Sequence, residues 1–287
     1  MNALSKAKTF ESIFDINDIK YQLADKGWVL LRGYPVDIEI FSDLLQQLCS
    51  HLTFDPARQS VTEANPKIDA GTCPVGLHIE NGNTPLPPDI VGLYSGKSAI
   101  LGSQTTLCDG VALWQSMPEK LQALFSQPIT VRRTLPSHIW KRYVANAPAI
   151  TDVNTVSEFD LEVFLGAAPG HKGQLNSDGD LDYQLTINPV TSDNLSEQKA
   201  FANAILGPSF NYENPTYTFA DGSAVTDDLI SQLTLLAEQV TGDLKWQDGD
   251  VVIIDNKRVM HGRRRIIGPI SERKLFIGMG NMDEDSI

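Results

Sequence analysis

Two histidines and one glutamate have the residue types and spacing of a metal site. His78 and Glu80 are separated by one residue, so on an extended strand both side chains project from the same face and can converge on one ion. His261, far downstream, offers a third ligand. Such a facial set leaves three coordination positions open, which suits non-haem Fe(II) that binds a cosubstrate and O2 together. The pattern predicts an oxygenase with His78, Glu80 and His261 as metal ligands and catalytic residues.

The residues after Glu80 indicate where the strand ends. Asn81-Gly82-Asn83 is a turn sequence, so Glu80 should lie where a short strand opens into a turn, a common place for sites. Asn81 and Asn83 are candidates to orient Glu80 or to contact substrate. Both also have a structural reason to be there, because asparagine is a good turn former. His-x-Glu itself occurs by chance in many sequences, so the context must carry the prediction.

Composition restricts the partners. The 287 residues are 41% hydrophobic, enough for a large core, and 36 acidic against 23 basic side chains give a net charge of -13. This charge argues against nucleic acid and anionic membranes as partners and favours a small-molecule substrate. No run approaches the roughly 18 apolar residues of a membrane span, and the first residues lack a signal-peptide core, so we expect a cytoplasmic protein.

The cysteines give no sign of a disulfide framework or a zinc site. Cys49, Cys73 and Cys108 are odd in number and show no Cys-x-x-Cys pairing. We expect three buried small hydrophobic residues, with Cys73 of interest for its nearness to His78.

Local patterns predict a mainly β (α+β) protein. Helical spacing and caps indicate four helices, at 15–26, about 38–52, 111–125 with a break at Pro118, and 226–241 with Thr226 as cap. Apolar, β-branched runs bounded by turn residues indicate strands at 28–32, 89–94, 103–107, 251–254 and 274–278. Many short strands separated by turns are typical of a jelly roll. His51 continues the apolar stripe of the second helix and is expected to be a core or helix-end residue.

The middle of the chain has a different composition. Residues from about 130 to 225 are rich in Asn, Asp, Gly, Ser and Thr, with short strand-like pieces. They lie between the second and third metal ligands, so we expect an insertion or lid over the active site within a single domain spanning 1–287. His138 and His171 fall in this region without nearby ligand partners and receive no role.

Several blocks together resemble the iron(II)- and 2-oxoglutarate-dependent dioxygenases of the TauD and clavaminate synthase-like superfamily. The blocks are 78–81, 87–94, 102–110 and 248–263, followed by Arg273. The resemblance implies a double-stranded β-helix (jelly roll) core with flanking helices. It also implies Fe(II), the cosubstrate 2-oxoglutarate and O2, with iron on His78, Glu80 and His261.

The same resemblance assigns the cosubstrate residues. Arg273 matches the arginine that binds the distal carboxylate of 2-oxoglutarate, a task suited to its bidentate fork. Thr105 matches the supporting threonine, and Thr106 is the alternative if the register is shifted. An ion-paired surface arginine and a threonine present for its β-propensity are the structural alternatives.

Two departures bear on the substrate. Family members often carry a second arginine four residues after the first, where this chain has Ile277, so an anionic substrate must find another cation. Candidates are Arg263, Arg264 and Arg265 past the metal histidine, and Arg132 and Arg133 in the insertion, of which Arg133 is preferred. Glu80 itself argues against halogenation, which needs that position vacant. Glu in place of the commoner Asp resembles the clavaminate synthase branch, which includes hydroxylases of free amino acids.

These features predict hydroxylation of an unactivated C–H bond in a free amino acid or amino-acid-derived metabolite, with succinate and CO2 as coproducts. Desaturation, epoxidation or cyclisation of a natural-product intermediate is possible on the same iron site. A cupin-like metal enzyme without 2-oxoglutarate and a non-catalytic jelly-roll binding protein are further alternatives.

Overall fold

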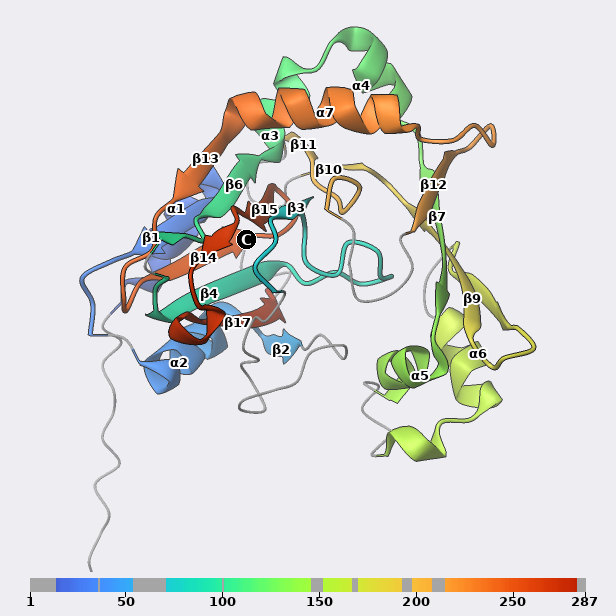
Figure 1. Ribbon diagram of the computed structural model, residues 1–287, viewed down its shortest axis with the longest axis horizontal. Helices are drawn as coiled ribbons and strands as arrows, with labels where there is room; N and C mark the ends of the chain where they lie inside the picture. Colours follow the sequence, from blue (N-terminus) through green and yellow to red (C-terminus); the bar gives the residue numbers. More distant parts are fainter. Residues whose placement is uncertain are drawn as a thin grey trace, which may run out of the picture.

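The computed structural model describes residues 14–35, 37–53, 71–99, 101–145, 152–166, 170–192, 198–207 and 215–282 (Figure 1). Within these ranges two antiparallel sheets form the core, and a third sheet with two helices stands to one side. The helices are α1 (Ile16–Lys26), α2 (Ile38–Leu48), α3 (Gly110–Ser116), α4 (Glu119–Phe125), α5 (Ser137–Ala145), α6 (Glu158–Gly166) and α7 (Asp227–Val240), with 3-10 turns η1 (Val153–Thr155) and η2 (Ile270–Glu272). None of them is long and apolar enough to cross a membrane.

The first core sheet has the strand order β1-β14-β4-β17-β2. Its strands are β1 (Trp28–Leu31), β14 (Val251–Asp255), β4 (Ile90–Lys97), β17 (Lys274–Asn281) and β2 (His51–Thr53). Strand β14 is buried along its whole length because both faces are covered. Val251 and Ile253 pack with α1 and α2, whereas Val252 and Ile254 point toward the second sheet. The run of four apolar residues in the sequence reflects this double burial.

The second core sheet has the order β13-β6-β15-β3. Its strands are β13 (Thr241–Leu244), β6 (Thr105–Asp109), β15 (Val259–Arg263) and β3 (Val75–His78). Leu107, Leu244 and Val259 pack against Leu93 and Ile277 of the first sheet, so the inner faces of the two sheets share one apolar layer. The chain passes directly from the first sheet to the second, since one short turn joins β14 to β15.

The insertion forms a sheet of its own, in the order β12-β7-β9-β8, which stands beside the core in Figure 1. Its strands are β7 (Ile129–Leu135), β8 (Lys172–Leu175), β9 (Leu181–Ile187) and β12 (Thr216–Phe219). One face packs on α5 and α6 around Trp140, Leu161 and Leu181. The pairs β10 (Val190–Ser192) with β11 (Lys199–Phe201), and β5 (Leu101–Gly102) with β16 (Ile266–Ile267), complete the strands of the described ranges.

Helices α3, α4 and α7 join the insertion to the core. In one apolar cluster, Leu233 of α7 and Phe125 of α4 pack with Val131 of β7, Phe219 of β12 and Met260 of β15. The base of the insertion is therefore held by buried side chains on both sides.

Most predicted elements are confirmed, with local differences. Asp15 caps α1 and Thr226 caps α7 through side-chain hydrogen bonds, and the predicted 111–125 helix is broken before Pro118. The second helix is shorter than the predicted range of about 38–52. Cys49 is extended, the helix ends at Leu48, and His51 is exposed at the start of β2, paired with Asn281 of β17. Sheet pairing overrides the helical stripe there, so the core or helix-end role predicted for His51 is wrong.

The cysteine prediction holds for two of three residues. Cys49 and Cys108 are buried, and burial raises the pKa of their thiols to about 12 and about 11, so both are protonated and unreactive at neutral pH. Cys73 is exposed, which corrects the expectation of burial. It lies on the irregular segment before β3, where no sheet covers it.

Candidate metal centre

The two histidines of the predicted triad form a cross-strand pair. His78 ends β3 and lies directly opposite His261 of β15, with ring centroids 4.7 Å apart. The pairing is interrupted by a bulge on β3 between Val75 and His78. A bulge of this kind re-aims the neighbouring side chain. Gly262 permits the close approach, because a Cβ there would lie 2.6 Å from the carbonyl oxygen of Val75.

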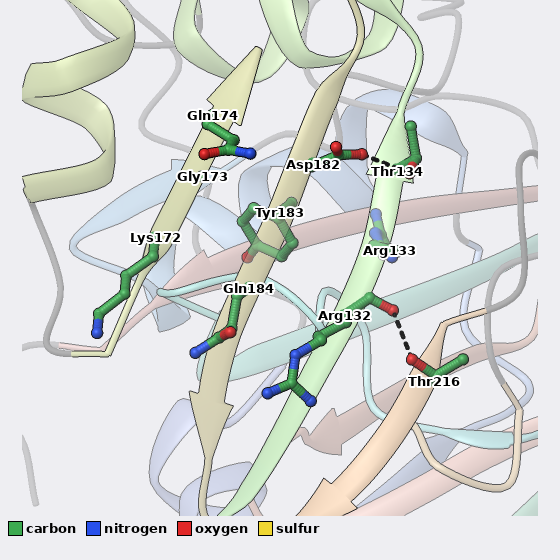
Figure 2. A pocket seen from close by; sticks show the side chains of 10 residues that line it. All are labelled: Arg132, Arg133, Thr134, Lys172, Gly173, Gln174, Asp182, Tyr183, Gln184 and Thr216. Atoms are coloured by element: carbon green, nitrogen blue, oxygen red, sulfur yellow. Dashed lines mark hydrogen bonds between the residues drawn. The ribbon is translucent and has the colours of Figure 1, made fainter. Parts of the chain in front are cut away.

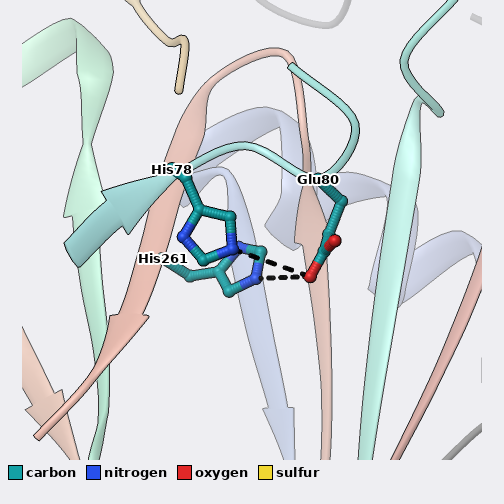
Figure 3. A group of neighbouring side chains, drawn as sticks. All are labelled: His78, Glu80 and His261. Carbon is teal, nitrogen blue, oxygen red and sulfur yellow. Dashed lines mark hydrogen bonds and ion pairs between the residues drawn. The ribbon is translucent and has the colours of Figure 1, made fainter. Parts of the chain in front are cut away.

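Glu80 reaches the histidines from a turn. The prediction that His78 and Glu80 share one extended strand is wrong in detail, since β3 ends at His78 and Glu80 opens the turn that follows. The prediction that the strand opens into a turn at this residue is confirmed. The turn brings Glu80 Oε1 to 3.3 Å from His261 Nε2 and 3.8 Å from His78 Nε2 (Figure 3). Its side chain is buried.

The arrangement fits a divalent metal. His78, Glu80 and His261 each offer one ligand atom, all within 4.8 Å of one another, and they are the one such group found in the described ranges. His78 Nδ1 lies 2.8 Å from the carbonyl oxygen of Gly76. Because a carbonyl can only accept, the proton belongs on Nδ1 and the Nε2 lone pair faces Glu80. Two imidazole nitrogens and one carboxylate oxygen are the donors of a facial Fe(II) site.

A cavity of about 80 Å³ between the core sheets brings the triad together with both predicted cosubstrate residues. It is lined by Val75, His78, Glu80, Leu93, Thr105, His261, Gly262, Arg263, Arg273 and Leu275. Arg273 is buried between η2 and β17. A buried guanidinium in a cavity of this kind can hold a carboxylate through two parallel hydrogen bonds.

Of the two candidate threonines, Thr105 is the one that lines the cavity. It lies opposite Arg263 on β15, on the face that also carries His261, whereas Thr106 lies opposite Gly262 and points to the other face. Trp246 Nε1 donates to Thr105 Oγ1 at 2.9 Å. That hydroxyl keeps its own proton to donate to another acceptor. The register alternative Thr106 does not line the cavity.

Three residues at the site were missed or under-weighted by the sequence reasoning. Trp246 orients Thr105, and the buried Asn256 contacts the backbone of Glu80. Arg263 lines the cavity and donates to the carbonyl oxygens of Gly71 and Cys73 at 2.7 and 2.6 Å. The only signal for Arg263 was its place two residues after His261, where strand alternation repeats the side-chain direction.

The predicted substrate residues lie on the insertion side of the Glu80 turn. Arg133 is buried, with its guanidinium carbon 5.9 Å from the ring centre of Tyr183. Tyr183 donates its hydroxyl to the carbonyl oxygen of Asn83 at 3.1 Å, and the amide of Asn83 donates to the Tyr217 hydroxyl at 3.1 Å. Burial raises the pKa of Tyr217 to about 12, so this hydroxyl stays protonated. Arg133 and Asn83 line one small cavity of about 10 Å³.

Asn81 has a turn-forming role in the structure. Its φ is +55°, in the left-handed region, and its carbonyl oxygen accepts hydrogen bonds from Thr84. Neither Asn81 nor Asn83 is among the described residues that line the metal cavity. The other cations differ in burial: Arg264 is ion-paired with Glu238 and Asp243, while Arg132 and Arg265 are exposed.

A larger hollow, of about 510 Å³, lies on the insertion sheet, away from the triad. Side chains from neighbouring strands line it in register, with Lys172, Gln184, Arg132 and Thr216 in one row (Figure 2). It contains none of the triad and opens widely to solvent. The smaller cavity, with its metal donors and the buried Arg263 and Arg273, is therefore the candidate reaction site.

The chain is similar to known proteins over most of its length. The model of the family described as "Taurine catabolism dioxygenase TauD, TfdA family" matches residues 8–278. The dapdiamide synthesis protein DdaC of Enterobacter agglomerans is 23% identical over 300 residues, which cover 96% of this chain and 90% of DdaC. Among solved structures, PvcB from Pseudomonas aeruginosa has a TM-score of 0.61 at 13% identity, covering 96% of this chain and 82% of PvcB. A taurine dioxygenase from Burkholderia xenovorans has a TM-score of 0.61 at 13% identity, covering 93% and 80%.

The family match and the donor set define the class of protein, an Fe(II)- and 2-oxoglutarate-dependent dioxygenase that also uses O2. Within that class, the chain belongs to the TauD, TfdA family. This result excludes the two alternatives of a 2-oxoglutarate-independent cupin-like enzyme and a non-catalytic binding protein. The structural neighbours, at this low identity, show a common fold of mixed helices and antiparallel strands.

Proposed function

We propose that the enzyme hydroxylates an unactivated C–H bond of a free amino acid or an amino-acid-derived small molecule. In this proposal His78, Glu80 and His261 hold Fe(II), and Arg273 and Thr105 hold 2-oxoglutarate. The observation that carries it is that all five residues line one cavity. When bound there, iron would activate O2, which is the oxidant for C–H cleavage, and 2-oxoglutarate would supply two of the four electrons as it is converted to succinate and CO2.

The protein's part is to bind, orient and exclude water. The Gly76 carbonyl holds His78 in the tautomer that presents Nε2. Arg273 offers two parallel N–H donors to the distal carboxylate of 2-oxoglutarate. Thr105 accepts a hydrogen bond from Trp246 and donates its hydroxyl proton to the same carboxylate. Leu93, Leu275 and Val75 form the apolar wall of the cavity, which strengthens these charged contacts by excluding solvent.

Two further arginines support a carboxylate-bearing substrate. Arg263 lines the same cavity as Arg273, and Arg133 lines the small cavity on the insertion side of the Glu80 turn. A guanidinium can hold a carboxylate through two parallel hydrogen bonds, so each of these arginines offers a place for the carboxylate of an amino acid.

Desaturation, epoxidation or cyclisation of a biosynthetic intermediate is the second candidate. One relative is named for dapdiamide synthesis, and PvcB is described as an Fe, alpha-ketoglutarate dependent oxygenase from an isonitrile synthetic pathway. Such relatives favour a small metabolite as substrate. The iron site is the same for both candidates, and the position of the substrate above it decides the outcome.

We further propose that the two core sheets are a double-stranded β-helix (jelly roll) within one domain, and that the insertion, predicted at about 130–225, acts as a lid. Two contacts support the lid: Tyr183 donates to Asn83, and the N–H of Ile79 donates to the carbonyl oxygen of Asn203 at 3.0 Å. Both join the insertion to the segment that carries Glu80. The sheet itself begins slightly earlier than predicted, at Ile129.

The test uses protein purified without oxygen and loaded with Fe(II). It is incubated with 2-oxoglutarate, O2 and a panel of free amino acids and simple amino-acid amides, and succinate and product mass are followed. We expect one panel member to stimulate succinate formation and to gain one oxygen atom. A product that loses two hydrogens supports desaturation or cyclisation. Epoxidation of a C=C bond adds one oxygen atom, as hydroxylation does, and is recognised by loss of the olefinic proton signals in the NMR spectrum of the product. No stimulation by any panel member contradicts the amino-acid assignment.

A further inference from the structure

Asn256 makes an unusual set of contacts with Glu80. The side chain is fully buried, and its Oδ1 accepts the N–H of Glu80 at 2.8 Å. Its Nδ2 donates to the carbonyl oxygen of Glu80 at 3.1 Å and to that of Pro88 at 2.9 Å. One amide therefore satisfies both backbone polar groups of the same residue, as a neighbouring strand would do in a ladder.

Glu80 needs such support more than the histidines do. His78 and His261 are fixed by β-ladder pairing, whereas Glu80 lies beyond the end of β3. Buried backbone groups must find partners, and a turn residue without a sheet neighbour depends on side chains for them. The Asn256 amide fixes the position of the Glu80 backbone, and hence the position from which the Glu80 side chain extends toward the histidines.

The position of Asn256 is itself well fixed. It begins the turn between β14 and β15, and its N–H donates to the carbonyl oxygen of Asp89 at 2.8 Å. In the next residue, Lys257, the N–H donates to Asp255 Oδ1 at 2.9 Å. The turn then leads into β15, which carries His261. One short connection between the two sheets thus delivers one candidate ligand and holds the backbone of another.

We propose that Asn256 is a positioning residue that holds the Glu80 carboxylate in the donor set of the metal. This rests on the proposed function, in which Glu80 binds iron. Removal of the amide would leave the histidine pair intact, but the Glu80 backbone would lose the hydrogen bonds that fix its position. The expected consequence is weaker metal binding out of proportion to the loss of fold stability.

The experiment compares Asn256→Ala with Asn203→Ala. Asn203 is also buried, and its side chain also makes two backbone hydrogen bonds, to the Pro189 carbonyl oxygen at 2.9 Å and from the Ile205 N–H at 3.0 Å. Its backbone carbonyl, which accepts from Ile79, is kept in the variant. Asn203→Ala therefore imitates the loss of a buried amide without touching Glu80.

Three quantities are measured on each protein: the melting temperature without metal, the affinity for Co(II) as an oxygen-stable probe, and the visible absorption of anaerobic Fe(II) with 2-oxoglutarate. We expect Asn256→Ala to lower metal affinity by about 10–100-fold, the range typical when a residue that orients a metal ligand is removed. Asn203→Ala should lower the melting temperature by a similar amount and keep wild-type metal affinity. Asn256→Ser, which can keep one hydrogen bond, provides a milder variant if the alanine variant does not fold.

Two outcomes overturn the proposal. One is wild-type metal affinity in a folded Asn256 variant, which makes the residue purely structural. The other is an equal loss of affinity in Asn203→Ala, which makes the effect a general consequence of destabilisation. Failure of the wild-type protein to bind Fe(II) with 2-oxoglutarate is a different result, because it contradicts the proposed function itself.

Discussion

The core sheets and the insertion sheet are both antiparallel, but they use their faces differently. In the core, β14 is buried on both faces, and the cavity with the metal donors lies between the two sheets. In the insertion, β7 alternates, with Arg133 on the buried face and Arg132 on the exposed face. In the proposed function, the core supplies the groups that bind the metal and 2-oxoglutarate and that need a dry, fixed environment. The insertion supplies one buried cation and contacts to the Glu80 turn, so variants in the two regions should separate iron and cosubstrate binding from substrate selection.

The largest effect is expected from the core, in His261→Ala. Removal of one of three donors should abolish substrate-stimulated succinate formation and lower Fe(II) affinity by more than the roughly 100-fold upper range for residues that only orient ligands. Anaerobic titration with Fe(II) in the presence of 2-oxoglutarate measures it. Wild-type binding by this variant would remove His261 from the donor set.

Arg273→Ala comes next. Loss of charged hydrogen bonds worth about 1.5–3 kcal/mol should raise KM for 2-oxoglutarate by roughly 10–150-fold. Fe(II) affinity should stay unchanged, because Arg273 is not a donor. Arg264→Ala is the control, since its guanidinium is partly exposed and paired with Glu238 and Asp243. Equal effects from the two variants would show that general loss of positive charge, not the cavity arginine, is responsible.

Arg133→Leu tests the insertion. We expect unchanged Fe(II) affinity and unchanged KM for 2-oxoglutarate, together with an increase of about tenfold or more in KM for a carboxylate-bearing substrate. Arg132→Leu is a matched control one residue away on the opposite face of the same strand. A change in 2-oxoglutarate binding in Arg133→Leu would contradict the proposal that the core binds the cosubstrate and the insertion selects the substrate.

The smallest effect concerns the pH dependence of stability. His171 is buried between the rings of Phe164 and Tyr183, and burial lowers its pKa. The unfolded chain therefore binds a proton at higher pH than the folded one, so His171 stabilises the fold less as pH falls from about 6.5, the ordinary histidine value, through the lowered pKa. The melting temperature of metal-free protein should fall more steeply from pH 7 to pH 5 in the wild type than in His171→Phe. Parallel curves would contradict the assignment.

Features that rest on local patterns and rare residue types are predictable from the sequence. The caps Asp15 and Thr226 marked two helices correctly, and the His78–Glu80 spacing with His261 indicated the donor set that the structure brings together. Thr105 and Arg273 followed from a family resemblance, and they line the same cavity. The role of the triad in metal binding and the role of Thr105 and Arg273 in cosubstrate binding stay predictions, which the variants above test.

The remainder depends on long-range contacts. Nothing near Asn256 in the sequence indicates that its amide meets Glu80, 176 positions away. His51 fits a helical stripe, but pairing with a strand 230 positions downstream decides its conformation. Of the five candidate arginines, Arg133 and Arg263 are buried. Which arginines are buried depends on the faces of the sheets, and strand alternation alone does not say which face is covered.

The short turn between β14 and β15 has a consequence for folding. It joins the two core sheets, and the donor set unites residues that are far apart in the sequence, since Glu80 and His261 are 181 positions apart. Contacts of such high separation form late, after the loop-closure entropy has been overcome. The metal site should therefore mature only when the two sheets dock, and metal added during refolding should select the docked state rather than nucleate it.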